Sequence, residues 1–187
     1  MSNPSFVHLD VNTQYSLGRS TIRQDQLIDA CTDMGMPAVG VTDHNNLFSA
    51  YKLYKSAQKK GIKYIIGSTV TILDQKERIK SKLSLLCENE TGYKNLCALI
   101  TQSYTEKLDK NEPLIDKKWL ESRTEGLIAI SSSNNGYLQQ SKSMDESMAL
   151  QWIISLQELF PDRLFVSISR MGIPNEEKVN QLTIELS

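Results

Sequence analysis

Short apolar segments alternate with amphipathic helical patterns along the whole chain. The apolar segments are bounded by glycine, proline or polar residues, which is typical of buried strands. We expect strands at residues 6–9, 38–42, 62–70, 83–87, 127–130 and 164–168. Apolar residues at helical spacing predict helices at 22–34, 48–57, 93–104 and 148–159, and another after Pro174. This alternation predicts an α/β fold, in which helices cover a parallel sheet of the barrel or doubly wound type.

The last helical pattern, Glu176 to Ser187, is not followed by another strand. A barrel that ends on its sixth helix lacks the strand that would close it. We therefore expect residues 1–187 to form one domain that stops before its last strand, although a naturally short C-terminal helix is the alternative. A missing strand would leave unpaired edges beside the first and sixth strands, which predicts poor solubility or dimerisation.

Composition narrows the class of protein. The 187 residues include 21 basic and 22 acidic residues, a net charge of −1 that indicates neither a nucleic-acid nor a membrane-surface protein. We find no signal peptide and no apolar run long enough to span a bilayer. Three cysteines without a CxxC pair fit reduced thiols, so we expect a cytoplasmic protein. The two histidines, His8 and His44, are too few for a site built from many imidazoles.

Several common catalytic and nucleotide-binding motifs are absent from the sequence. No GxGxxG follows the first strand, and no GxxxxGK[ST] occurs, which argues against dinucleotide and P-loop sites. No GxSxG occurs either, so an α/β-hydrolase nucleophile is unsupported. A pairing of His44 with the serines at 131–133 stays open, but nothing in the spacing recommends it.

Polar residues gather where the first two strands end. Asp10 and Asn12 close the first strand on one side of it, and Asp43 and His44 close the second. In parallel βα architectures these strand ends meet at the edge where ligands bind. Their oxygen atoms and single imidazole suit one hard cation such as Mg²⁺ or Mn²⁺. The alternative is that Asp43 caps the following turn while His44 packs or hydrogen-bonds nearby.

Six motif blocks follow one another along the chain. The longer blocks are FVHLDVNTQYS at 6–16, GMPAVGVTDHNNLF at 35–48 and GIKYIIG at 61–67. The shorter ones are TGYKNL at 91–96, EGLI at 125–128 and FPDR at 160–163. Together these blocks resemble the PHP domain of bacterial DNA polymerase III alpha subunits: they stand in the family's order and near its spacing, and they cover essentially the whole chain.

The resemblance implies a PHP-type distorted (βα)7 barrel, with six of its seven strands in this chain. In PHP domains the barrel carries a cleft for three metal ions, and some members hydrolyse phosphoesters or proofread DNA. The full alpha subunit is a DNA-directed DNA polymerase, for which Mg²⁺ is the expected cofactor. Its catalytic carboxylates lie in a palm domain, and nothing in this chain corresponds to a palm.

The metal ligands of active PHP domains are largely missing from the matching positions. Active members have His-x-His at the end of the first strand, where this chain has Asp10 and Asn12. The strand-two histidine is retained as His44, preceded by Asp43. The other matching positions hold Arg19, Thr69, Lys82, Ser133 and Met171.

Two of these positions hold cations, which are strongly unfavourable beside a divalent metal in a partly buried cleft. The resemblance therefore implies a vestigial cleft with no catalytic and no metal-ligating residue, and no cofactor for this chain. Arg19 and Lys82 are placed to pair instead with Asp10 and Asp43, as a salt-bridged plug. One residual metal ion near His44 stays open.

Polymerases with such degenerate PHP domains rely on a separate proofreading exonuclease subunit that docks on the PHP region. The resemblance thus implies a scaffold, with other replisome subunits and DNA reached through regions absent here, and with no membrane partner. The alternatives are a stand-alone metal-dependent PHP phosphoesterase and an unrelated α/β binding protein.

Overall fold

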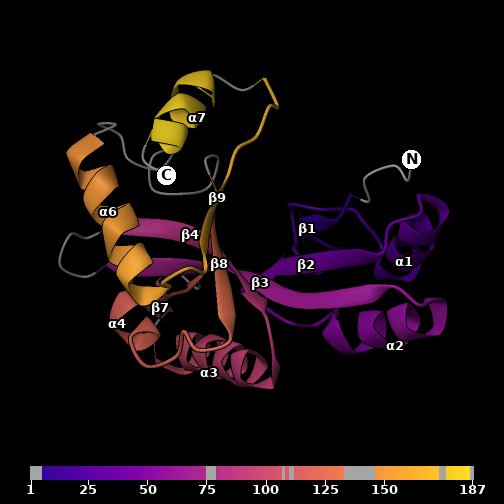
Figure 1. Cartoon of the computed structure of the whole chain (residues 1–187). Coiled ribbons are helices and arrows are strands. Elements are labelled where there is room, and N and C mark those ends of the chain that lie inside the picture. The colour runs from indigo at the N-terminus through magenta and orange to yellow at the C-terminus, as the bar shows by residue number, and fades with distance from the viewer. Residues whose placement is uncertain are drawn as a thin grey trace.

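One curled sheet forms the centre of the protein (Figure 1). The computed structural model describes residues 6–74, 79–106, 108–109, 112–132, 146–172 and 176–185. The main path of the sheet follows the order β1-β2-β3-β4-β8-β9, and a short strand, β7 (Ile115–Asp116), adds to the end of β3. The main strands are β1 (His8–Val11), β2 (Ala38–His44), β3 (Lys63–Asp74), β4 (Ile79–Cys87), β8 (Leu127–Ser132) and β9 (Leu164–Ser167). All six strands expected from the sequence are confirmed.

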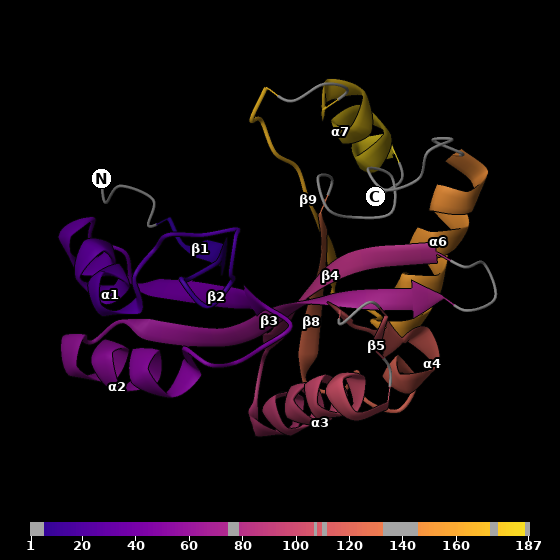
Figure 2. The same ribbon diagram turned by 180° about the vertical axis from the view of Figure 1, so that it is seen from behind.

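Helices flank the sheet in two groups (Figures 1 and 2). The first group, α1 (Gln24–Asp33) and α2 (Ala50–Lys60), lies beside β1, β2 and the start of β3. The second group, α3 (Glu90–Glu106), α4 (Lys117–Leu120) and α6 (Glu146–Leu159), lies at the other end of β3. A two-stranded hairpin, β5 (Leu108–Asp109) and β6 (Glu112–Pro113), follows α3, and α7 (Glu176–Glu185) follows β9.

Two hydrophobic cores correspond to the two helix groups. The smaller core packs α1 and α2 on β2 through buried residues such as Ile28, Val39 and Leu53. The larger core packs α3, α4 and α6 on β3, β4 and β8. Strand β3 contributes to both, because Tyr64 packs on the smaller core while Ile72 lies inside the larger one.

The sheet is mixed, so the expectation of a parallel sheet is wrong. Strands β1, β2 and β3 are parallel, as are β8 and β9, but β4 runs antiparallel to both of its neighbours. Residues 75–78 are the whole connection between β3 and β4. Four residues cannot hold the crossover that a parallel pair needs, so these strands form a hairpin.

Glycine does not interrupt β3, which continues through Gly67 to Asp74. A Cβ at Gly67 would lie 2.6 Å from the carbonyl oxygen of Leu85 on the neighbouring strand. The residue therefore permits a close approach between β3 and β4 rather than ending the strand.

Strands β1 and β9 end the main path of the sheet, and each has one strand neighbour among the described residues. An apolar hollow of about 630 Å³ lies between these ends. Its lining includes Phe6, Leu9, Ile65, Leu86, Ile130 and Phe165. Poor solubility or dimerisation of the chain stays a prediction.

Candidate functional site

Strand register brings most of the expected site residues to one small polar pocket. In the sheet His44 of β2 lies opposite Thr69 of β3, and Thr69 lies opposite Ser84 of β4. Since β1 ends beside β2, its last polar residues reach the same place. The pocket has a volume of about 70 Å³ and is lined by Asp10, Asn12, Arg19, His44, Thr69, Lys82 and Ser84.

Uncharged groups hold Asp10 and Asn12 in this pocket. The Asp10 Oδ1 atom accepts hydrogen bonds from the Thr42 hydroxyl and, at 3.1 Å, from the Ser84 hydroxyl. The Ser84 Oγ atom also lies 2.8 Å from Thr69 Oγ1. Asn12 donates from Nδ2 to the Thr42 carbonyl oxygen at 2.9 Å. Hydroxyl and amide groups from four strands and loops thus form one side of the pocket.

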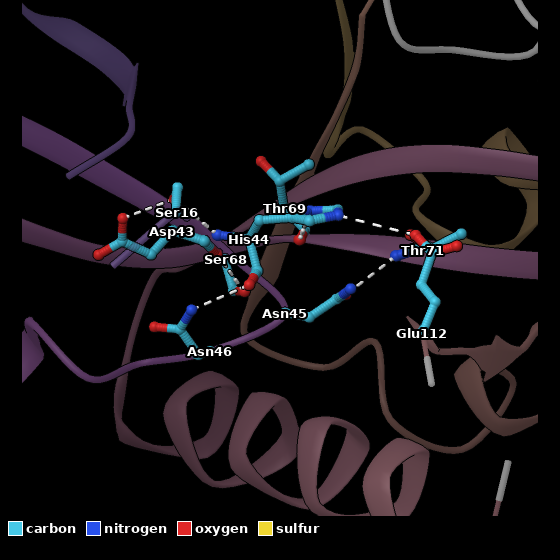
Figure 3. Close-up of polar contacts among 9 residues, drawn as sticks. All are labelled: Ser16, Asp43, His44, Asn45, Asn46, Ser68, Thr69, Thr71 and Glu112. Carbon is cyan, nitrogen blue, oxygen red and sulfur yellow. Dashed lines mark hydrogen bonds and ion pairs between the residues drawn. The ribbon is translucent and has the colours of Figure 1, made fainter. Parts of the chain in front are cut away.

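Asp43 does not line the pocket, although it was expected there. Its carboxylate is buried and accepts four hydrogen bonds: from the Thr13 amide and hydroxyl, both at 2.7 Å, from Ser16 Oγ at 2.8 Å and from Ser49 Oγ at 2.7 Å. Figure 3 shows Asp43 turned toward Ser16, whereas His44 points toward Glu112. Strand residues alternate in direction, so neighbours in β2 cannot both face the pocket. Asp43 joins the loop after β1 to the turn before α2.

The expected salt-bridged plug is wrong. Ion pairs join neither Arg19 nor Lys82 to Asp10 or Asp43 anywhere in the described ranges. Asp43 is satisfied by hydroxyl and amide donors, and Asp10 by hydroxyls. Both cations therefore face the pocket without a carboxylate partner in contact.

His44 is a neutral imidazole at physiological pH. Burial, together with the positive charges of Arg19 and Lys82, lowers its pKa to about 4. Nδ1 lies 3.1 Å from the Thr69 carbonyl oxygen, and a carbonyl only accepts, so Nδ1 carries the proton. Nε2 then holds a lone pair, and its 3.8 Å contact with the Glu112 carboxylate is not an ion pair at neutral pH.

The pKa of Lys82 is also lowered in this pocket. Burial lowers the pKa of its ammonium group, and the nearby Arg19 charge lowers it too, while Glu112 acts in the opposite direction. Mutual repulsion of this kind requires that the two cations lie close together. The pocket therefore concentrates positive charge at the carboxyl ends of β1 and β2.

Met171, like Asp43, does not line the pocket. Met171 lies in the segment after β9, and 67% of it is exposed to solvent. Ser133 lies outside the described residues.

Two residues near the site were not predicted from the sequence, Ser84 and Glu112. Ser84 follows Lys82 by two positions in a strand, so alternation alone places it on the same face. Glu112 comes from the β5–β6 hairpin, and no sequence motif predicts that hairpin.

The residues present do not fit a metal cluster. Over the described part of the chain, no three His, Cys, Asp or Glu side chains are grouped to hold a metal ion. A guanidinium and an ammonium group line the pocket instead. Their charges oppose a divalent cation, because like charges at short range in a partly buried site repel strongly.

The lowered pKa of His44 predicts a pH-dependent stability. His44 is neutral in the folded protein down to about pH 4 but takes up a proton near pH 6.5 when unfolded. The unfolded state thus binds more protons than the folded state between these pH values. The stability that the folded protein retains by keeping His44 neutral is therefore fully present above about pH 6.5 and is lost as the pH falls toward 4. We expect the free energy of unfolding to drop by about 3 kcal/mol more in the wild type than in His44→Gln over this range.

Urea denaturation of both proteins at several pH values measures this difference. Gln retains an amide that can donate to the Thr69 carbonyl oxygen but does not titrate, and His8 is common to both proteins. Parallel pH profiles for the two proteins would contradict the assignment.

The PHP domain model matches residues 8–171 of this chain. The chain belongs to the PHP domain family. This PHP domain is 36% identical over 180 residues to the DNA polymerase III subunit alpha of Pseudomonas aeruginosa, covering 93% of this chain and 15% of that protein. It is 34% identical over 189 residues to the same subunit of Escherichia coli K12, covering 100% of this chain and 16% of that protein. The chain thus spans about a sixth of these relatives, and the resemblance seen in the motif blocks is confirmed.

A solved structure supports the fold of this PHP domain. It is similar to a proposed metal-dependent phosphoesterase from Bifidobacterium adolescentis, with a TM-score of 0.64 and 10% sequence identity. The similarity covers 98% of this chain and 85% of that one. At this identity the comparison establishes the fold alone.

None of the described helices is long and apolar enough to cross a membrane.

Proposed function

We propose that this PHP domain is a module of a DNA polymerase III alpha subunit, and that it acts in chromosomal DNA replication as a non-catalytic scaffold for the proofreading exonuclease subunit. The relatives are alpha subunits, so the whole protein would be a DNA-directed DNA polymerase that uses Mg²⁺ through regions outside this chain. Contacts with DNA and other replisome subunits would also come from those regions. We propose a cytoplasmic location.

One observation carries the non-catalytic part of the proposal: Arg19 and Lys82 line the pocket where a metal-dependent member would bind cations. A metal-dependent hydrolase needs bound cations to activate water and to polarise the phosphoester. Two fixed positive charges oppose both the binding of those cations and their function. No described side chain other than His44 offers an imidazole in the pocket.

Cross-linking of the assembled polymerase tests the scaffold. We expect the exonuclease subunit to co-elute with the full-length alpha subunit, and lysine cross-links from it to fall within residues 1–187. Exposed lysines on α2, such as Lys52, Lys55 and Lys59, are available to react with the cross-linker. Cross-links that map only to the rest of the alpha subunit would rule out this chain as the docking region.

A stand-alone metal-dependent phosphoesterase is the second candidate. It is favoured by the Nε2 lone pair of His44, a residue that lines the same pocket as Asp10. Turnover of p-nitrophenyl phosphate with Mn²⁺ separates the candidates. We expect none from this chain, whereas turnover that disappears in His44→Ala would favour the phosphoesterase. Calorimetric titration with Mn²⁺ and Zn²⁺ gives an independent measure, because micromolar binding lost in the same variant contradicts a metal-free cleft.

A further inference from the structure

We propose that the solvent-facing side of α2 binds single-stranded nucleic acid without sequence preference. The site, which we call the α2 patch, consists of two aromatic and three basic residues: Phe48, Tyr51, Lys52, Lys55 and Lys59. None of these residues lines the polar pocket at the strand ends. The inference does not rest on the scaffold role, since no exonuclease subunit takes part in it. It adds a nucleic-acid contact to those proposed for regions outside this chain.

Helical spacing places the five side chains of the α2 patch on one side of the helix. Phe48 lies in the turn that leads into α2, three residues before Tyr51 and four before Lys52. Lys55 follows Tyr51 by four positions, and Lys59 follows Lys55 by four. Residues three or four apart are neighbours on a helix surface, so the five form a continuous stripe. The buried residues of α2 lie on the opposite side, against the smaller core and β3 (Figure 1).

The two aromatic rings of the α2 patch are open to solvent. Phe48 is 69% exposed and Tyr51 is 70% exposed. The Phe48 ring is held edge-on to the ring of Tyr15, with 6.0 Å between the ring centroids. Every nucleobase has a flat aromatic face that can stack on such a ring, whatever its sequence. The patch therefore offers stacking positions for unpaired bases.

The charge around these rings is positive. Residues 44–73 include five lysines and no acidic residue, although the net charge of the whole chain is −1. Asp29 of α1 pairs with Lys60 at 3.1 Å. The three lysines of the α2 patch have no carboxylate partner among the described residues. Since the Lys55 ammonium lies 5.8 Å from the Tyr51 ring centroid, a stacked base would have a cation near its own phosphate.

Lysines combined with aromatic rings favour a nucleic acid over a protein partner. Lysine is depleted in the cores of protein–protein interfaces, whereas basic side chains beside aromatic rings are typical of surfaces that bind single strands. A duplex is a poorer ligand, because its bases stack on one another and do not reach the rings. With 11 residues α2 is about 16 Å long, which suits a short site of about four nucleotides.

Fluorescence anisotropy of a labelled single-stranded oligonucleotide, titrated with the 187-residue protein at low salt, tests the proposal. We expect a dissociation constant on the order of 10–100 µM. The matching duplex and an abasic strand, which keeps the phosphates but lacks the bases, should bind at least about fivefold more weakly. Three lysine contacts predict that log K falls against log[salt] with a slope of about −2. Unlabelled RNA should compete as well as DNA, because neither stacking nor phosphate contact requires the 2′-hydroxyl.

Variants separate the stacking contribution from the electrostatic one. Tyr51→Ala should weaken binding at least about fivefold without changing the salt slope, whereas Tyr51→Phe keeps the ring and should bind as the wild type does. Lys55→Gln should reduce the size of the salt slope by about 0.7. Tyr104→Ala and Lys94→Gln on α3 are the matched controls, because both residues are exposed and lie outside the α2 patch. Circular dichroism confirms that each variant is folded.

Three results would overturn the proposal. They are a single strand that does not bind, duplex or abasic strands that bind equally well, and Tyr51→Ala and Lys55→Gln proteins that both bind as the wild type does. Cross-links from another subunit to the lysines of α2, without any binding of the single strand, would assign the patch to a protein partner and would also overturn it. Loss of strand binding leaves the scaffold role untouched, because cross-linking of the assembled polymerase measures that role separately.

Discussion

Asp43→Ala is expected to lower the free energy of unfolding by about 3–5 kcal/mol, measured by urea denaturation. The carboxylate is 1% exposed and accepts four hydrogen bonds at 2.7–2.8 Å. Alanine would leave the Thr13 amide and the hydroxyls of Thr13, Ser16 and Ser49 without their acceptor. Hydrogen bonds to a charged acceptor each contribute about 1.5–3 kcal/mol, and solvation of the released hydroxyls offsets part of the sum.

Two further variants separate this network from the simple loss of a charge. Asp43→Asn keeps the shape but places an amide donor where the carboxylate accepts, so it too should destabilise by more than about 1 kcal/mol. Asp25→Ala removes an exposed carboxylate paired with Arg23 and should leave stability unchanged within error. A loss below about 1 kcal/mol in Asp43→Ala would show that the network adds little to stability.

Gly92→Ala should destabilise the protein by at least about 3 kcal/mol, although alanine is the better helix former. Gly92 lies near the start of α3, where its backbone meets the turn that leads into β8. A Cβ at this position would lie 1.8 Å from the Gly126 carbonyl oxygen. That oxygen also accepts a hydrogen bond from the Glu88 amide at 2.9 Å, so it cannot move without further loss.

The sign of this effect is decisive, because helix propensity alone would make Gly92→Ala stabilising by about 1 kcal/mol. Gly18→Ala is the control: Gly18 has a φ of +72° but open space around it, so only the backbone preference is lost, about 1 kcal/mol. Thermal and urea denaturation of both variants give the comparison. A Gly92→Ala protein as stable as the wild type would mean that α3 shifts away from Gly126 freely.

Strand ends were predictable, but the direction of individual side chains was only partly so. Apolar runs located all six main strands, and the meeting of strand ends brought Asp10 and His44 together, whereas Lys82 was placed with them by the family resemblance. Asp43 was misplaced because strand alternation was not applied to two adjacent residues. The same rule would have found Ser84 beside Lys82.

The direction of β4 and the position of Glu112 could not be predicted from the hydrophobic periodicity of the sequence. The antiparallel course of β4 depends on the four-residue connection after β3, which periodicity does not record. Glu112 reaches His44 only because the β5–β6 hairpin folds toward β3, where Thr71 donates to it at 3.1 Å. Contacts of this kind depend on tertiary structure and not on local sequence.

Strand β3 has a consequence for how the protein unfolds. The strand is continuous from Lys63 to Asp74, and its two ends belong to different hydrophobic cores. Neither core can lose its packing without disturbing a strand that the other core also needs. We therefore expect the two halves of this PHP domain to unfold as a single cooperative unit rather than as two independent subdomains.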